Sequence, residues 1–113
     1  MNATCKPQRA IIDRLLPMVI QPALIVFHQA SRLSLHKIFP HISAINIGAD
    51  AKDFACLGEK TNSYSTVIVD DALARINDYR SALADWFRVL KPNGTLILVV
   101  PQQFYYEEKL MPP

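Results

Sequence analysis

The sequence is short of glycine, cysteine and net charge. It holds 3 glycines and 2 cysteines among 113 residues, and its formal net charge is only +2. Cys5 and Cys56 show no paired spacing, so we expect reduced thiols in a cytoplasmic protein rather than a disulfide framework or a cysteine metal site. The basic residues form no stripe interleaved with aromatic residues, which argues against a nucleic-acid partner.

The sequence also lacks a long hydrophobic run. Its most apolar stretch, residues 15–27, is interrupted by two prolines and a glutamine and is too short to cross a bilayer. Nothing after it resembles the cleavage site of a secretory leader. We therefore expect no membrane partner and no targeting segment. His36 and His41 have no third ligand nearby in the sequence, so no metal site is expected either.

The composition that is present indicates one globular domain. Half of the residues are apolar and 19% are charged. A chain of this length can bury about two-thirds of its unfolded surface, which is enough for a core. We divide the single domain 1–113 into an N-terminal helical segment (1–21), an α/β core (22–101) and a tail (102–113).

Strands and helices are predicted to alternate along the core. Short apolar runs predict strands covered on both faces, and the alternation in residues 42–47 (ISAINI) also predicts a strand. Apolar residues at 3.6-residue spacing before a proline predict amphipathic helices. The predicted strands are residues 23–27, 42–47, 66–69 and 95–100, and the predicted helices are residues 8–16, 32–39 and the stretch from Asn77 to Pro92. This alternation implies parallel strands joined by right-handed crossovers.

Several side chains receive specific predictions from this pattern. Ser31 is expected to cap the second helix, with His36 on the side nearer to solvent. Tyr79 and Trp86 recur at helical spacing and are expected in the core. Residues 91–94 read as a turn in which Gly94 takes a positive φ.

Residues 65–101, STVIVDDALARINDYRSALADWFRVLKPNGTLILVVP, closely resemble the second half of class I S-adenosylmethionine-dependent methyltransferases. In that family a strand ends in an acidic or polar pair, a helix carries the pattern RvLkpgG, and a strand follows the turn. Here residues 88–94 (RVLKPNG) occupy the pattern, with Asn93 where glycine is commoner. The resemblance implies an α/β fold of the three-layer Rossmann-like methyltransferase type. Its sheet is expected to be reduced and mostly parallel, with about four to five strands.

The resemblance also implies a site for S-adenosylmethionine at the carboxyl ends of the strands. Residues 28–31 stand where the glycine-rich cofactor loop belongs, and Asp50 stands where an acidic residue binds the ribose hydroxyls. The acidic pair 70–71 ends the third predicted strand. The predicted cofactor-binding residues are Phe27, His28, Gln29, Ala30, Asp50, Asp70 and Asp71, and no catalytic residue is assigned.

Each of these residues also has a purely structural interpretation. Asp50 would cap the loop after its strand, and Asp70 and Asp71 would form a solvated turn pair. His28 would be a loop histidine without a role. The aromatic residues 104–106 of the tail would either line a partner or substrate surface or pack on the sheet edge, and packing is the expectation.

The sequence departs from the family in three places: the cofactor loop, the segment 51–65 and the chain after Pro101. A non-glycine residue held in the left-handed region costs roughly 1–2 kcal/mol. Two such positions, at His28 and Ala30, would weaken cofactor binding about 30- to 1000-fold. Residues 51–65 are too few for the usual third strand and its helix, and no strand is expected after Pro101. The exposed sheet edge or the aromatic tail is therefore a candidate surface for a homodimer.

Three functions stay open on this evidence. The first is methyl transfer to an unknown small-molecule or saccharide acceptor. The saccharide follows from the tail VPQQFYYEEKLMPP, which is similar to that of some bacterial methyltransferases encoded near polysaccharide genes. The second is an inactive methyltransferase-fold domain that serves as an interaction or scaffold module. The third is an α/β domain for another nucleotide.

Overall fold

The computed structural model describes residues 10, 12–28, 34–47, 57–70, 72, 76, 78–100 and 103–109, without the side chains of residues 103 and 104. Residues 12–15 are helical and lead into a 3-10 helix, η1 (Leu16–Met18). The other elements follow in chain order as β1 (Ala23–Phe27), α2 (Leu35–Ile38), β2 (Ser43–Asn46), β3 (Tyr64–Asp70), α3 (Tyr79–Val89), β4 (Leu90–Val100) and β5 (Gln103–Glu108).

These strands form one sheet in the order β2-β1-β3-β4-β5. The first four strands are parallel, and β5 pairs antiparallel with β4. The central strands are the apolar runs of the sequence, because a strand that is covered on both faces has no need of polar alternation. The predicted α/β fold with a reduced, mostly parallel sheet is confirmed.

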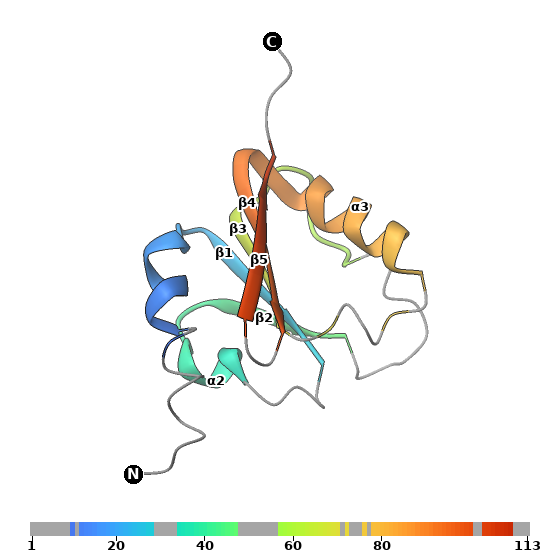
Figure 1. The fold of residues 1–113 in the computed structure, drawn as a ribbon. Coiled ribbons are helices and arrows are strands. Elements are labelled where there is room, and N and C mark those ends of the chain that lie inside the picture. The colour runs from blue at the N-terminus through green and yellow to red at the C-terminus, as the bar shows by residue number, and fades with distance from the viewer. Residues whose placement is uncertain are drawn as a thin grey trace.

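Helices cover both faces of the sheet, as Figure 1 shows with α3 on one side and α2 and the N-terminal helix on the other. Trp86 of α3 is fully buried against alternate strand residues such as Leu24 and Val67. On the opposite face, Leu35 of α2 packs with Ile25 and other strand residues of the second set. Successive strand residues therefore serve two separate half-cores, which is the three-layer arrangement.

Helix α3 begins two residues later than the sequence predicts. Asp78 is its N-cap, and its side chain accepts hydrogen bonds from the backbone N–H of Ser81 at 3.2 Å and from the Ser81 hydroxyl at 2.7 Å. The core placement of Trp86 is confirmed, but that of Tyr79 is wrong, since Tyr79 is 47% exposed. Tyr79 lies in the first turn of α3, where its ring lies 5.9 Å from Arg80 Cζ.

The turn predicted at residues 91–94 is part of β4, which follows α3 without a loop. The positive φ belongs to Asn93, at 67°, and not to Gly94. Gly94 is required for a different reason: a Cβ there would lie 2.9 Å from the carbonyl oxygen of Lys91 and 3.0 Å from that of Ser65. Glycine allows β3 and the bent start of β4 to approach each other closely.

The tail contains a strand, contrary to the expectation that no strand follows Pro101. Residues Gln103–Glu108 pair with Thr95–Val100 along the outer edge of β4. Lys109 extends the pairing through its backbone, because its N–H donates to the Gly94 carbonyl at 2.8 Å. Its ammonium also donates to the Leu90 carbonyl at 2.8 Å and to the Asn62 amide oxygen at 3.0 Å. Within the described residues, no helix is long and apolar enough to cross a membrane.

Candidate functional site at the carboxyl edge of the sheet

The strand order of the sheet reverses between β1 and β3, and we call the carboxyl ends of these two strands the crevice, because open α/β sheets bind ligands there. From β1 the chain passes through α2 to β2 on one side, and β3 then lies on the other side of β1. Helices α2 and α3 pack on opposite faces, so the connections diverge where β1 and β3 end. Open α/β sheets bind their ligands at such a reversal of strand order, outside the carboxyl ends of the strands.

Three side chains form a row across this edge. Phe27 is the register partner of Asn46 at the end of β2 and of Asp70 at the end of β3. By strand alternation, all three share the face of Ile25 and Ile68, which is the α2 face. Phe27 and Asp70 were predicted from the sequence, and the structure brings them side by side; Asn46 was not predicted.

Asp70 is fully buried, with no exposed surface. Its Oδ2 atom accepts a hydrogen bond of 2.9 Å from the backbone N–H of Leu35, the first residue of α2. The interpretation of Asp70 as part of a solvated turn is therefore wrong. The carboxylate of β3 instead holds the chain at the point where it enters α2, after the loop that follows β1.

Phe27 contributes a ring stack on the same face. Its ring lies parallel to that of His36 in α2, with 3.8 Å between centroids and 7° between planes. The prediction that His36 lies toward solvent is wrong, because the side chain is half-buried and its Nδ1 atom is buried without a hydrogen-bond partner in the described part of the chain. Ile38, at the end of the same helix, is 43% exposed.

The loop after β1 is described at its two ends only. His28 is half-buried and has no positive φ, so the strain expected from a non-glycine residue does not occur there. Ser34, at the end of the loop, does take the left-handed conformation, with φ 51° and ψ 50°. The predicted site residues Gln29, Ala30, Asp50 and Asp71 lie outside the described residues, as does the predicted cap Ser31.

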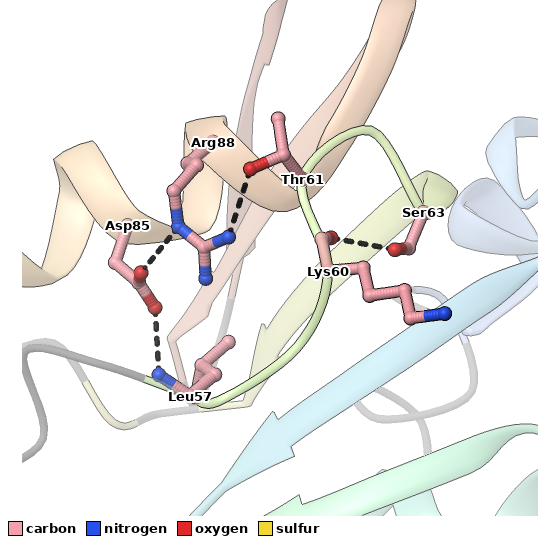
Figure 2. Close-up of polar contacts among 6 residues, drawn as sticks. All are labelled: Leu57, Lys60, Thr61, Ser63, Asp85 and Arg88. Carbon is pink, nitrogen blue, oxygen red and sulfur yellow. Dashed lines mark hydrogen bonds and ion pairs between the residues drawn. The ribbon is translucent and has the colours of Figure 1, made fainter.

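A second polar cluster joins the segment before β3 to α3 (Figure 2). The Asp85 carboxylate accepts from the backbone N–H of Leu57 at 2.7 Å and from Arg88 Nε at 2.9 Å. Arg88 also donates to the Thr61 hydroxyl at 3.0 Å. Asp85 is only 8% exposed. Its hydrogen bonds hold the segment before β3 against α3. Nothing in the local sequence pattern pointed to this cluster, because its partners lie 28 positions apart in the chain.

The comparisons with known proteins agree with this architecture. A family model described as "Methyltransferase domain" matches residues 29–98, which run from the loop after β1 into β4. The chain belongs to this methyltransferase family. The match begins just after β1 and contains α2, β2, β3 and α3. The resemblance seen in residues 65–101 is therefore confirmed, and the match also includes the chain between β1 and β3. No curated protein matches the chain.

Solved structures share the fold at low sequence identity. A putative methyltransferase from Bacillus halodurans has 13% identity and a TM-score of 0.57, over 87% of this chain and 46% of that chain. A putative sarcosine dimethylglycine methyltransferase from Galdieria sulphuraria has 16% identity and a TM-score of 0.61, over 83% of this chain and 45% of that one. A phosphoethanolamine N-methyltransferase from Haemonchus contortus, solved with S-adenosylhomocysteine, has 14% identity and a TM-score of 0.58, over 82% and 27%.

The chain thus spans less than half the length of these three structures. Family membership supports S-adenosylmethionine as the cofactor, and the described part of the crevice fits this group in two respects. The β1 and β3 ends lie side by side at Phe27 and Asp70, which places the loop after β1 at the reversal of strand order. The Phe27–His36 stack lies on the α2 side of this edge, and open α/β sheets bind their ligands beyond the carboxyl ends of the strands. Within the described residues, no group of three potential metal ligands occurs.

Proposed function

We propose that this methyltransferase domain binds S-adenosylmethionine beyond the carboxyl ends of β1, β2 and β3 and transfers its methyl group to a small-molecule or saccharide acceptor. The observation that supports this proposal is the pairing of Phe27 with Asp70 at the reversal of strand order. Asp70 lies inside the segment 29–98 that the family model matches, and Phe27 immediately precedes that segment. When bound, the cofactor supplies an electrophilic methyl group that an acceptor nucleophile takes up in line.

The residues of the chain act in this proposal mainly by positioning. Asp70 fixes the start of α2 through Leu35, and so determines where the loop from His28 to Ser34 rejoins the fold. The backbone N–H of Ile47 donates to the Phe27 carbonyl at 2.8 Å, which fixes the departure of the chain from β2. Methyl transfer gains most of its rate from the alignment of donor and acceptor, so this site needs no strong base.

The second candidate is a domain of the same fold that no longer transfers methyl groups and serves as an interaction module. It is favoured by the lack of glycine at residues 28–31 and by the use of the Asp70 carboxylate for a structural hydrogen bond. Both observations reduce the groups that remain for cofactor recognition. A related candidate, an α/β domain for another nucleotide, rests on the same crevice.

Calorimetry with S-adenosylhomocysteine and S-adenosylmethionine separates these candidates. We expect a dissociation constant tighter than about 100 μM for the methyltransferase. Asp70→Asn, which replaces the carboxyl group at the end of β3, should weaken binding, whereas Asp13→Asn at an exposed position outside the strands should not. Saturating cofactor with no heat and no thermal shift would instead support the interaction module. A shift with ATP, NAD or FAD alone would support the third candidate.

Methyl transfer itself is tested with labelled S-adenosylmethionine and a panel of amines, phenols and saccharides. Label should appear in an acceptor only with a chain that binds the cofactor. A chain that binds tightly and labels no member of the panel would leave the cofactor site standing and contradict the proposed acceptor classes.

A further inference from the structure

The outer edge of β5 carries backbone groups that face away from the sheet. The N–H of Lys109 donates to the Gly94 carbonyl at 2.8 Å, and its carbonyl accepts from the Asn93 N–H at 2.7 Å. Both backbone groups of Lys109 therefore point toward β4. In an antiparallel pair this orientation alternates, so Tyr105 and Glu107 also face β4, whereas Tyr106 and Glu108 direct their N–H and C=O groups outward.

In the described part of the chain, no strand occupies this outer edge, because β5 stands at the end of the sheet order. Tyr105 and Tyr106 are 56% and 57% exposed, so the expectation that they pack on the sheet is wrong for both side chains. A shallow hollow of about 420 Å³ opens beside them, lined by Leu96, Leu98, Tyr105, Tyr106 and Glu107. An exposed edge with large apolar side chains is a surface on which another strand can pair.

We propose that β5 pairs with β5 of a second copy of the chain, antiparallel and about a twofold axis at Tyr106, to give one continuous sheet across a homodimer. A twofold pairing is self-complementary and closes after two chains. In this register Tyr106 lies opposite Tyr106 of the second copy, Phe104 opposite Glu108, Tyr105 opposite Glu107, and Gln103 opposite Lys109. The outward groups of residues 104, 106 and 108 then form about six backbone hydrogen bonds.

The charges of the tail select this register over its neighbours. With the axis at Tyr106, both glutamates lie opposite aromatic residues, and the Tyr105 hydroxyl can donate to the Glu107 carboxylate. If the twofold axis moved from Tyr106 to Glu107, Glu107 would lie opposite Glu107 of the second copy. If the axis moved to Glu108, Glu108 would lie opposite Glu108 of the second copy. Like charges in direct opposition destabilise a strand pair. A twofold axis at Tyr105 would avoid this repulsion, but it would shorten the paired segment of β5.

The proposal concerns assembly and does not depend on the proposed methyl transfer. Sedimentation of the full chain at about 10–500 μM should show a mass that rises from 12.7 kDa toward twice that value. Tyr106→Pro should abolish the rise, because it removes an outward N–H and leaves the inward ladder to β4 intact. Tyr106→Thr retains the N–H and a side chain suited to strands, so it should still dimerise. Circular dichroism verifies that each variant is folded.

Cysteine cross-linking tests the register independently of the proline variant. In a Cys5→Ser, Cys56→Ser background, Tyr106→Cys should form a disulfide-linked dimer on mild oxidation, since directly paired residues lie about 5.5 Å apart at Cα. Tyr105→Cys and Glu108→Cys should not cross-link, because each pairs with a different residue of the second copy. A monomeric mass throughout the concentration range, or cross-linking at Tyr105 in preference to Tyr106, would overturn the proposal.

Discussion

The carboxylate of Asp70 at the end of β3 accepts a 2.9 Å hydrogen bond from the backbone N–H of Leu35 at the start of α2. The two residues lie 35 positions apart in the chain, and both are fully buried. This contact joins the two sides of the crevice where the cofactor is proposed to bind. The geometry of the crevice therefore depends on the Asp70 side chain, which the sequence identifies only as an acidic residue at the end of a strand.

Replacement of Asp70 should therefore destabilise the fold. Asp70→Ala leaves the buried N–H of Leu35 without its acceptor, which costs about 1–3 kcal/mol in the free energy of unfolding. Asp70→Asn keeps an acceptor oxygen of the same size and should cost less. Urea denaturation measures both, with the exposed Asp13→Ala as the control, expected within about 0.5 kcal/mol of the parent. Equal stability of Asp70→Ala and the parent would show that the contact contributes nothing.

Gly94 and Asn93 should respond in opposite ways to substitution. Gly94→Ala places a Cβ 2.9 Å from the Lys91 carbonyl oxygen and should destabilise the chain by about 1–3 kcal/mol. Asn93→Gly relieves a positive φ of 67° and should leave stability unchanged or raise it by up to about 1 kcal/mol. Thermal and urea unfolding of the two variants test this contrast. If Asn93→Gly were the more destabilising of the two, the result would support the conformation predicted from the sequence, with the positive φ at Gly94.

The polar cluster around Asp85 should stabilise the fold mainly through the buried Asp85 carboxylate. Asp85→Ala removes the acceptor of the Leu57 N–H and the partner of Arg88, and should cost about 1–3 kcal/mol. Arg88→Ala removes a partly exposed ion pair and should cost about 1 kcal/mol or less. Arg80→Ala, on the exposed face of the same helix, is the control. An Arg88→Ala loss larger than that of Asp85→Ala would locate the stabilisation in the ion pair instead of the Leu57 contact.

The cap of α3 should make stability depend on pH in the acid range. The hydrogen bonds from the Ser81 hydroxyl and backbone N–H lower the pKa of Asp78 below its ordinary value of 3.8. A carboxylate with a lowered folded-state pKa stabilises the fold above 3.8, and this contribution is lost as the pH falls through the lowered value. The melting temperature of Asp78→Asn should therefore differ from that of the parent near neutral pH by an amount that changes below pH 3.8.

Asp13→Asn serves as the matched control for this experiment, since Asp13 is exposed and lies outside α3. Its melting temperature is recorded with that of the parent at the same pH values, from about pH 6 to about pH 3, so that a change specific to Asp78 can be identified. A constant difference for Asp78→Asn over the same range would mean that the cap does not titrate with folding.

The sequence by itself determined the four parallel strands, the burial of Trp86 and the family. The runs at 23–27 and 66–69 are apolar without alternation, and only a strand covered on both faces buries every residue of such a run. Trp86 follows from helical spacing for the same reason, because burial of a large apolar side chain depends on its own chemistry and on a local period.

Only the tertiary structure decided what Asp70, Gly94, His36 and the tail do. Asp70 contacts Leu35, Gly94 lies close to Ser65, and β5 pairs with β4. No local sequence pattern predicts these contacts. The position of Tyr79 in the first turn of α3, outside the cover of the sheet, likewise depends on where the helix starts. Hydrogen bonds and close approaches act over a few ångströms in space, whereas sequence periodicity describes only neighbours along the chain.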